Sequence, residues 1–219
     1  MVSFSQRRKR RRPRACVTLA ALALGLMLAP PPMAAAGEAT AVVDTLVTNA
    51  LGTLSDKQLS AHDRDQRLRL LVEQDFDVPH IAHFMLGGYW DSASEAERQT
   101  FIGLFEEWMV ASYTDGFKDY HGETIQVTGS HPGNADTIIV SSEVVERDGA
   151  HGAKLDWVLR PIADSFKVIN INIEGMSLVM IERDQMLAVI AHHGGTVGGA
   201  NGALEAKLAT DDQSHGEKY

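Results

Sequence analysis

Residues 155–186 constrain the fold of this chain more than any other segment. An alternating apolar and polar run at 155–159 is followed by a second apolar run at 166–173. The residues Glu-Gly-Met-Ser at 174–177 then lead into an amphipathic stretch that begins at Leu178. Alternation is typical of strands, and serine is a preferred residue at the start of a helix. This order predicts a curved sheet that folds over a helix.

The N-terminus has the pattern of an export signal. Basic residues at 7–12 and Arg14 precede an apolar run at 15–29, and three alanines at 34–36 before Gly37 offer a cleavage site. The apolar run is shorter than the roughly 20 residues that a membrane-spanning helix needs. We therefore predict a cleavable signal peptide at residues 1–36 and export to the periplasm. A single domain at 37–209 and a disordered tail at 210–219 are expected to follow.

Removal of this signal would leave a strongly acidic protein. The sequence holds 20 Lys and Arg and 29 Asp and Glu residues; seven of the basic ones precede Gly37, so 13 remain against 29, a formal charge of −16. Such a surface argues against binding to nucleic acid or to an anionic membrane. The one cysteine, Cys16, lies in the predicted signal. The exported domain would therefore have no thiol for a disulfide, a metal site or a nucleophile.

The first half of the exported chain reads as helices. Apolar residues recur at helical spacing over 40–54, and Asp63 is expected to cap a second helix. Asp77 and Pro79 predict the start of a third helix, which ends before two glycines at 87–88. The residues Ser-Glu-Ala-Glu at 94–97 form a capping box that opens a long fourth helix, expected to end near Asp119.

The second half reads as strands followed by helices. Strands are expected around 125–127 and over 137–145, 154–162 and 165–174, and the last changes phase after Val168, which predicts a bulge or burial on both faces. Helices are expected over 178–192 and 203–208. The predicted fold class is α+β: N-terminal helices pack on a curved antiparallel sheet of about four strands, C-terminal helices close it, and an apolar cavity lies between the layers.

Several residues are typical of metal, phosphate or catalytic sites but lack the expected partners. His80 and His83 are three apart on a predicted helix, whereas a metal site needs three or four ligands. The glycine-rich segment 194–202 lacks the lysine of a phosphate loop and follows a helix, so we interpret it as an interhelical loop. Ser177 has no nucleophile-elbow motif around it. We predict no metal, no cofactor and no enzymatic activity, although an acid–base pair formed by residues distant in sequence stays open.

Motifs in a fixed order connect these elements to a known family. The chain has Leu-Gly-Gly-Tyr-Trp at 86–90 and Glu-Gly-Met-Ser-Leu-Val at 174–179 followed by Arg183. The family pattern has Leu-Gly-x-Tyr-Trp and Glu-Gly-Val-Ser-Leu-Val followed by an arginine. Further matching positions are Phe76–Asp77, the helix start at 94–97 with Arg98, Phe101 and Phe105, and then Tyr113, Tyr120 and Gly122. Over roughly residues 40–208 the chain resembles the MlaC family, the periplasmic phospholipid-binding (toluene-tolerance auxiliary) components of the Mla lipid-transport system.

The resemblance implies a periplasmic lipid carrier. Such a protein takes phospholipid between an outer-membrane lipoprotein and porin complex and an inner-membrane ABC transporter, and so maintains the asymmetry of the outer membrane. A carrier is needed because each methylene in water costs about 0.8 kcal/mol, or about 24 kcal/mol for two chains of about 15 methylenes. The inward stripe of the fourth helix and the strand alternation then predict the residues of the cavity wall: Leu104, Phe105, Trp108, Val140, Val144, Leu155, Trp157, Ile171 and Met176.

Three other interpretations remain open at this stage. The chain departs from the family pattern around Phe166 and Met186, which keeps a carrier of hopanoids or another apolar ligand as an alternative. A small α+β enzyme of nuclear-transport-factor-like shape would place a polar pair, such as an Asp with a Tyr or His, inside the cavity. A periplasmic assembly factor would have a solid core without a cavity.

Overall fold

The computed structural model describes residues 32–116 and 120–216. Most of the predicted signal peptide, residues 1–31, lies outside the described residues. Helix α1 (Pro32–Ser55) begins earlier than the helix expected at 40–54 and includes the alanines of the predicted cleavage site.

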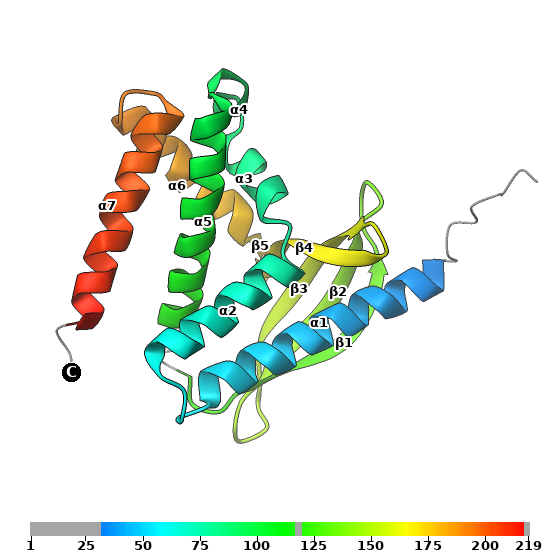
Figure 1. The fold of residues 1–219 in the computed structure, drawn as a ribbon. Coiled ribbons are helices and arrows are strands. Elements are labelled where there is room, and N and C mark those ends of the chain that lie inside the picture. Colours follow the sequence, from blue (N-terminus) through cyan, green and yellow to red (C-terminus); the bar gives the residue numbers. More distant parts are fainter. Residues whose placement is uncertain (1–31, 117–119, 217–219) are drawn as a thin grey trace, which may run out of the picture.

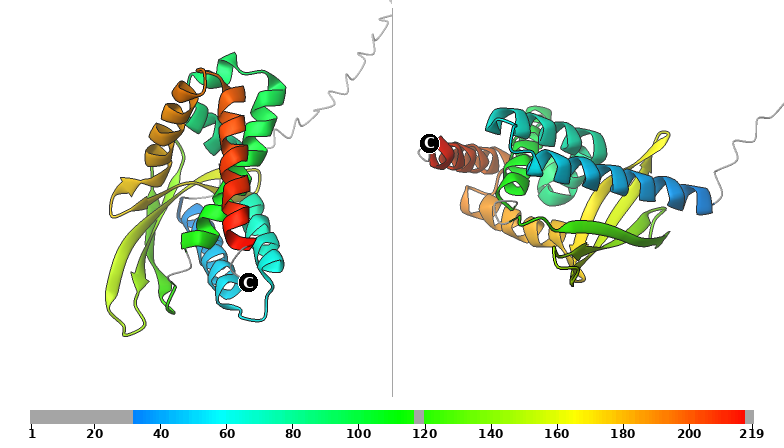
Figure 2. Two further views of the ribbon diagram at one scale, coloured as in Figure 1. Left: turned by 90° about the vertical axis from the view of Figure 1, so that its left-hand side faces the viewer. Right: turned by 90° about the horizontal axis from the view of Figure 1, so that it is seen from below.

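Five antiparallel strands form a sheet in which each strand pairs with the next along the chain. They are β1 (Thr124–Pro132), β2 (Ile138–Val145), β3 (His151–Ile162), β4 (Ser165–Ile173) and β5 (Met176–Ser177). The sheet curves around the helices (Figure 2). The predicted α+β class is confirmed. The fifth strand was not expected because β5 has only two residues, which return along β4 after Gly175.

The helices form two groups. In the first, α1 and α2 (Ala61–Asp75) lie over one face of the sheet, where α1 contacts β1, β2 and β4 (Figure 1). In the second, α5 and α7 lie side by side and α3 contacts α6 (Figure 1). The members of the second group are α3 (Val78–Leu86), the short α4 (Tyr89–Ser92), α5 (Glu95–Gly116), α6 (Leu178–His192) and α7 (Val197–Gly216). The end expected for the fourth helix, near Asp119, falls outside the described residues.

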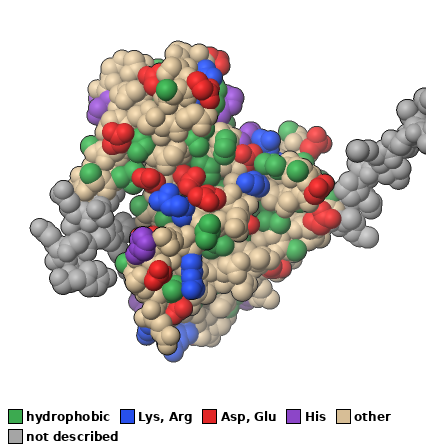
Figure 3. Space-filling model, in the orientation of Figure 1, with side chains coloured by type: hydrophobic (Ala, Val, Ile, Leu, Met, Phe, Trp, Pro, Cys, Tyr) green, Lys and Arg blue, Asp and Glu red, His purple; other side chains and the backbone are tan. Residues whose placement is uncertain are grey.

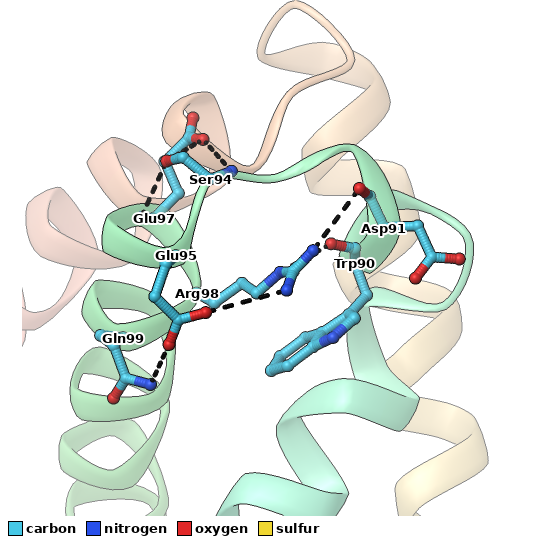
Figure 4. A network of polar contacts seen from close by, with 7 residues as sticks. All are labelled: Trp90, Asp91, Ser94, Glu95, Glu97, Arg98 and Gln99. Atoms are coloured by element: carbon cyan, nitrogen blue, oxygen red, sulfur yellow. Dashed lines mark hydrogen bonds and ion pairs between the residues drawn. The ribbon is translucent and has the colours of Figure 1, made fainter.

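Side-chain caps fix the helix starts largely as the sequence predicts. At the start of α5, the Ser94 amide donates to Glu97 Oε2 at 2.8 Å and the Glu97 amide donates to Ser94 Oγ at 3.3 Å, which is the predicted capping box (Figure 4). Ser177 Oγ accepts from the Met180 amide at the start of α6. The predicted cap of α2 was wrong by three residues. Ser60 is the cap, and its Oγ accepts from the Asp63 amide at 3.1 Å because Asp63 already lies in the first turn.

A bulge in β4 explains the predicted change of phase. Val158 of β3 pairs with Asn170, but the next residue, Leu159, pairs with Val168, so the register passes over Ile169. An extra residue in one strand turns the following side chains to the other face. Val168 and Ile171 are consequently both buried. The same face of β4 therefore supplies apolar residues before and after the bulge.

The two residues between α2 and α3 attach the helices to the sheet. Phe76 forms a parallel bridge with Val168, and the Asp77 amide donates to the Val168 carbonyl at 3.0 Å. Asp77 also caps α3 and forms an ion pair with Arg160 of β3, with 3.2 Å between Oδ2 and the guanidinium. This segment, called the Phe76–Asp77 junction below, covers the edge of β4 that β5 leaves unpaired.

The glycine-rich segment is an interhelical loop, as predicted, only at residues 194–196, where Gly194 and Gly195 have positive φ just after α6. Helix α7 begins at Val197 rather than near Ala203, and it extends to Gly216, into the range where a disordered tail was expected. A side chain at Gly199 would collide with the carbonyl oxygen of His193. Asn201 Nδ2 donates to the Glu97 carbonyl of α5 at 3.1 Å. The small residues therefore let the first turn of α7 approach the end of α6 and the start of α5.

We expect Gly199→Ala to lower the free energy of unfolding by about 1–3 kcal/mol, because the added methyl group meets backbone atoms that cannot move independently. The matched control is Gly202→Ala in the same helix, where a Cβ meets nothing within 4 Å. That variant should be stabilised by about 0.5–1 kcal/mol through helix propensity. Urea denaturation followed by circular dichroism measures both. Equal effects of the two substitutions would contradict this account of the segment.

Candidate functional site

An apolar cavity of about 240 Å³ lies between the sheet and the first two helices. We call it the sheet cavity. Helices α1 and α2 form one wall, and strands β1, β3 and β4 form the other. Every lining residue is apolar: Leu46, Val47, Ala50, Leu51, Leu54, Leu68, Leu71, Val72, Phe76, Ile125, Leu155, Trp157, Ile171, Ile173 and Leu178. Such a lining offers burial to a hydrocarbon ligand but no hydrogen bond to hold a polar one.

A second cavity of about 200 Å³ lies among α3, α5, α6 and β4. We call it the helix cavity. Most of its wall is apolar, but three polar residues, Ser112, Asn170 and Glu182, also line it. The remaining lining residues are Phe76, Ile81, Met85, Phe105, Trp108, Met109, Ile171, Leu178 and Val179.

The two cavities adjoin at a common wall. Phe76, Ile171 and Leu178 line both of them. Phe76 comes from the Phe76–Asp77 junction, Ile171 from β4 after the bulge, and Leu178 from the first residue of α6. The two volumes, 200 and 240 Å³, sum to about 440 Å³. That total lies within the range of about 300–1,000 Å³ that is typical of small-molecule sites.

The structure brings together five of the nine residues predicted for the cavity wall. Leu155 and Trp157 line the sheet cavity, Phe105 and Trp108 line the helix cavity, and Ile171 lines both. Whether these residues bind lipid stays a prediction.

The other four predicted residues line neither cavity. Leu104 precedes Phe105 by one residue, which turns it about 100° around α5. Val140 is fully buried beside Trp157, its partner on β3, and Val144 is half-buried against the core. Met176 is 60 % exposed, because the two-residue strand β5 lies at the edge of the sheet.

Sequence reasoning missed the contribution of the first two helices to the sheet cavity. Leu46, Ala50 and Leu54 repeat at helical spacing along α1 and line the cavity together. The stripe was visible in the sequence, but a stripe alone does not distinguish a cavity wall from a solid core. Phe76 belongs to the family motif, but no periodic pattern in the sequence marks it as a lining residue.

Trp157 reaches the sheet cavity with its one polar atom satisfied. Its indole Nε1 donates to Ser142 Oγ at 2.8 Å, and both residues are buried. A buried indole N–H usually needs such a partner. Ser142 follows Ile138 and Val140 in the inward row of β2, so its position could have been read from the alternation. The hydrogen bond fixes the ring without adding a polar group to the lining.

Two charged side chains, Glu182 and Lys207, lie at or next to the wall of the helix cavity. Glu182 of α6 lines the cavity, and burial raises the pKa of its carboxyl, while Lys207 of α7 acts in the opposite direction. The Lys207 Nζ lies 5.7 Å from the ring centroid of Trp108, which lines the same cavity. Asn170 is engaged within the fold, since its Oδ1 accepts from the Val179 amide and from Ser177 Oγ.

The histidines considered for a metal site have other contacts. Arg160 donates to His80 Nδ1 at 2.7 Å, so this nitrogen is the acceptor and His80 is neutral. Burial lowers the pKa of His80, and the Arg160 charge lowers it further. The His83 ring packs on Trp90 with 4.6 Å between centroids. Across the residues that the structure describes, no group of three or more His, Cys, Asp or Glu side chains could hold a metal ion.

One face of the outer surface carries charges of both signs. On the face seen in Figure 3, acidic and basic side chains are interspersed with hydrophobic ones. One ion pair joins α2 to α5, with 3.5 Å between the Arg69 guanidinium and Glu106 Oε1. Among the helices of residues 32–116 and 120–216, none has the length and hydrophobicity needed to cross a membrane.

Two comparisons with known proteins agree with this architecture. Residues 44–200 match the sequence model of a family described as MlaC protein. The fold is also similar to a solved structure described as the phospholipid-binding protein from Ralstonia solanacearum in complex with a phospholipid. The TM-score is 0.67 at 24 % sequence identity, and the match covers 80 % of this chain and 99 % of that one. At this identity the structural likeness concerns the fold.

We expect the free energy of unfolding to decrease as the pH falls below the ordinary histidine pKa of 6.5. The folded state lowers the pKa of His80, so the unfolded state takes up the proton first and acid favours unfolding. His80→Gln should make the pH dependence between 7 and about 5 shallower, because the group no longer titrates. Urea denaturation at several pH values measures this. A slope in His80→Gln equal to that of the unmodified protein would contradict the prediction.

Proposed function

This chain belongs to the MlaC protein family, and from that premise we propose that it is a periplasmic carrier of phospholipid. The observation that carries the proposal is the sheet cavity, whose lining is entirely apolar. It adjoins the helix cavity through Phe76, Ile171 and Leu178, so the two acyl chains of one lipid can occupy neighbouring spaces. The similar fold of a protein described as bound to a phospholipid supports the same ligand class.

The physical chemistry of lipid transfer favours this use of the cavities. Transfer of two acyl chains of about 15 methylenes each into water costs about 24 kcal/mol of free energy, and this cost prevents free diffusion between membranes. A protein that encloses the chains avoids this cost. Hydrocarbon needs no directional contact, so a lining without polar atoms retains the chains and still permits release.

Transfer between two membranes is the wider role that we propose. The donor and acceptor would be an outer-membrane lipoprotein and porin complex and an inner-membrane ABC transporter, and the exchange would maintain the asymmetry of the outer membrane. Family membership and the export-signal pattern of residues 1–36 support this place of action. In this role the protein binds and releases its ligand without chemical change.

Native mass spectrometry of the protein, purified from periplasm without detergent, tests the proposal. We expect a stoichiometric adduct with the mass of a phospholipid, and lipid extraction identifies it. A hopanoid mass would instead favour the alternative apolar ligand. A ligand-free spectrum that persists after incubation with phospholipid vesicles would refute the carrier role.

A substitution that fills the sheet cavity separates lipid retention from folding. Ala50 of α1 lines this cavity, and Ala50→Phe places a ring where we expect an acyl chain. We expect lipid occupancy to fall severalfold while the circular dichroism spectrum is unchanged. Ala41→Phe adds the same ring to an exposed position of the same helix and should retain lipid. Equal occupancy in the two variants would exclude the sheet cavity as the site.

A further inference from the structure

Charges of both signs lie at the margin of the helix cavity. Glu182 is on α6 and Lys207 on α7, two helices that contact each other beside α5 (Figures 1 and 2). Glu182 lines the cavity directly. Lys207 is exposed, and its ammonium lies 5.7 Å from the ring centroid of Trp108, another lining residue. The carboxylate thus lines the apolar space, and the ammonium lies against the ring of Trp108 in its wall.

Glu182 is partly buried at this margin rather than fully solvated. Burial disfavours the ionised carboxylate, and Lys207 offsets that effect only in part, since burial is the larger influence on the Glu182 pKa. A carboxylate that has lost water in this way gains from an additional cation. A ligand with a positive group at this point would supply it.

We propose that the margin of the helix cavity binds the head group of a zwitterionic phospholipid, with Glu182 contacting its ammonium and Lys207 its phosphate. This inference rests on the proposed function, because it presumes that acyl chains fill the cavities. The cavity behind the two charges is apolar apart from Ser112 and Asn170. A lipid whose chains enter there has its polar end at the Glu182 and Lys207 side chains.

The arrangement favours a head group that carries an amine over one with only negative charge. Both kinds offer a phosphate to Lys207. The amine adds an attractive contact with Glu182. A purely anionic head group supplies no cation to this carboxylate and places a second negative charge next to it. The excess of acidic residues that we predict for the exported protein, 29 against 13 basic, acts in the same direction.

The test is competitive loading of the delipidated protein from vesicles of equal phosphatidylethanolamine and phosphatidylglycerol. Native mass spectrometry reads both total lipid and the ratio of the two head groups. We expect phosphatidylethanolamine to be enriched about threefold, the size of effect that one partly exposed ion pair can give. A bound ratio equal to that of the vesicles would overturn the inference. Absence of both lipids would instead refute the proposed function.

Two variants assign the effect to the named residues. Glu182→Gln keeps the shape of the side chain and removes its charge, so binding of phosphatidylethanolamine should fall and the ratio should approach that of the vesicles. Lys207→Gln should lower total lipid without changing the ratio, since both head groups contain phosphate. Lys207 is exposed, so this second variant tests the site even if Glu182→Gln fails to fold.

Charge-matched controls are available at exposed positions away from the cavity lining. Glu205→Gln lies on α7 and Lys57→Gln lies between α1 and α2. Both should load like the unmodified protein. Retained enrichment in folded Glu182→Gln, or an equal loss of enrichment in Glu205→Gln, would show that overall charge rather than this site selects the head group.

Discussion

The Phe76–Asp77 junction is the attachment on which the rest of the architecture depends. Its backbone pairs with Val168 of β4, and the Asp77 carboxylate caps α3 while it contacts Arg160. Helix α2, which forms part of the sheet cavity, ends there, and α3, which borders the helix cavity, begins there. Phe76 itself lines both cavities. This segment is held by an ion pair and by hydrogen bonds, and it positions the walls of both cavities. Apolar contacts alone would not fix these positions, because hydrophobic contacts are not directional.

Much of this arrangement could be predicted from the sequence because its causes are local. A capping box, a proline in the first turn and the alternation of strands act over a few residues, and they located α3, α5 and β2–β4. The bulge was visible as a change of phase at Ile169. The order of motifs identified the family, which the match over residues 44–200 confirms.

What could not be predicted depends on contacts between distant residues. The glycines at 198–199 suggest a loop when read alone, but they lie in the first turn of α7, where a Cβ at Gly199 would meet the backbone of His193. Val140 and Leu104 line neither cavity, and the sequence could not show this for the same reason. Strand alternation and helical periodicity show which face of an element points inward. Whether that face borders a cavity or packs against another side chain depends on the element opposite it.

The common wall of the two cavities has a thermodynamic consequence. The side chains of Phe76, Ile171 and Leu178 contact both cavities. A ligand in one cavity that moves these side chains therefore changes the affinity of the other cavity for its own ligand. Such coupling is reciprocal: whatever the first acyl chain does for the second, the second does for the first. In the carrier role that we propose, the free energy of holding a two-chain lipid is then not the sum of two single-chain terms. A partner that displaces only one chain could release the whole molecule.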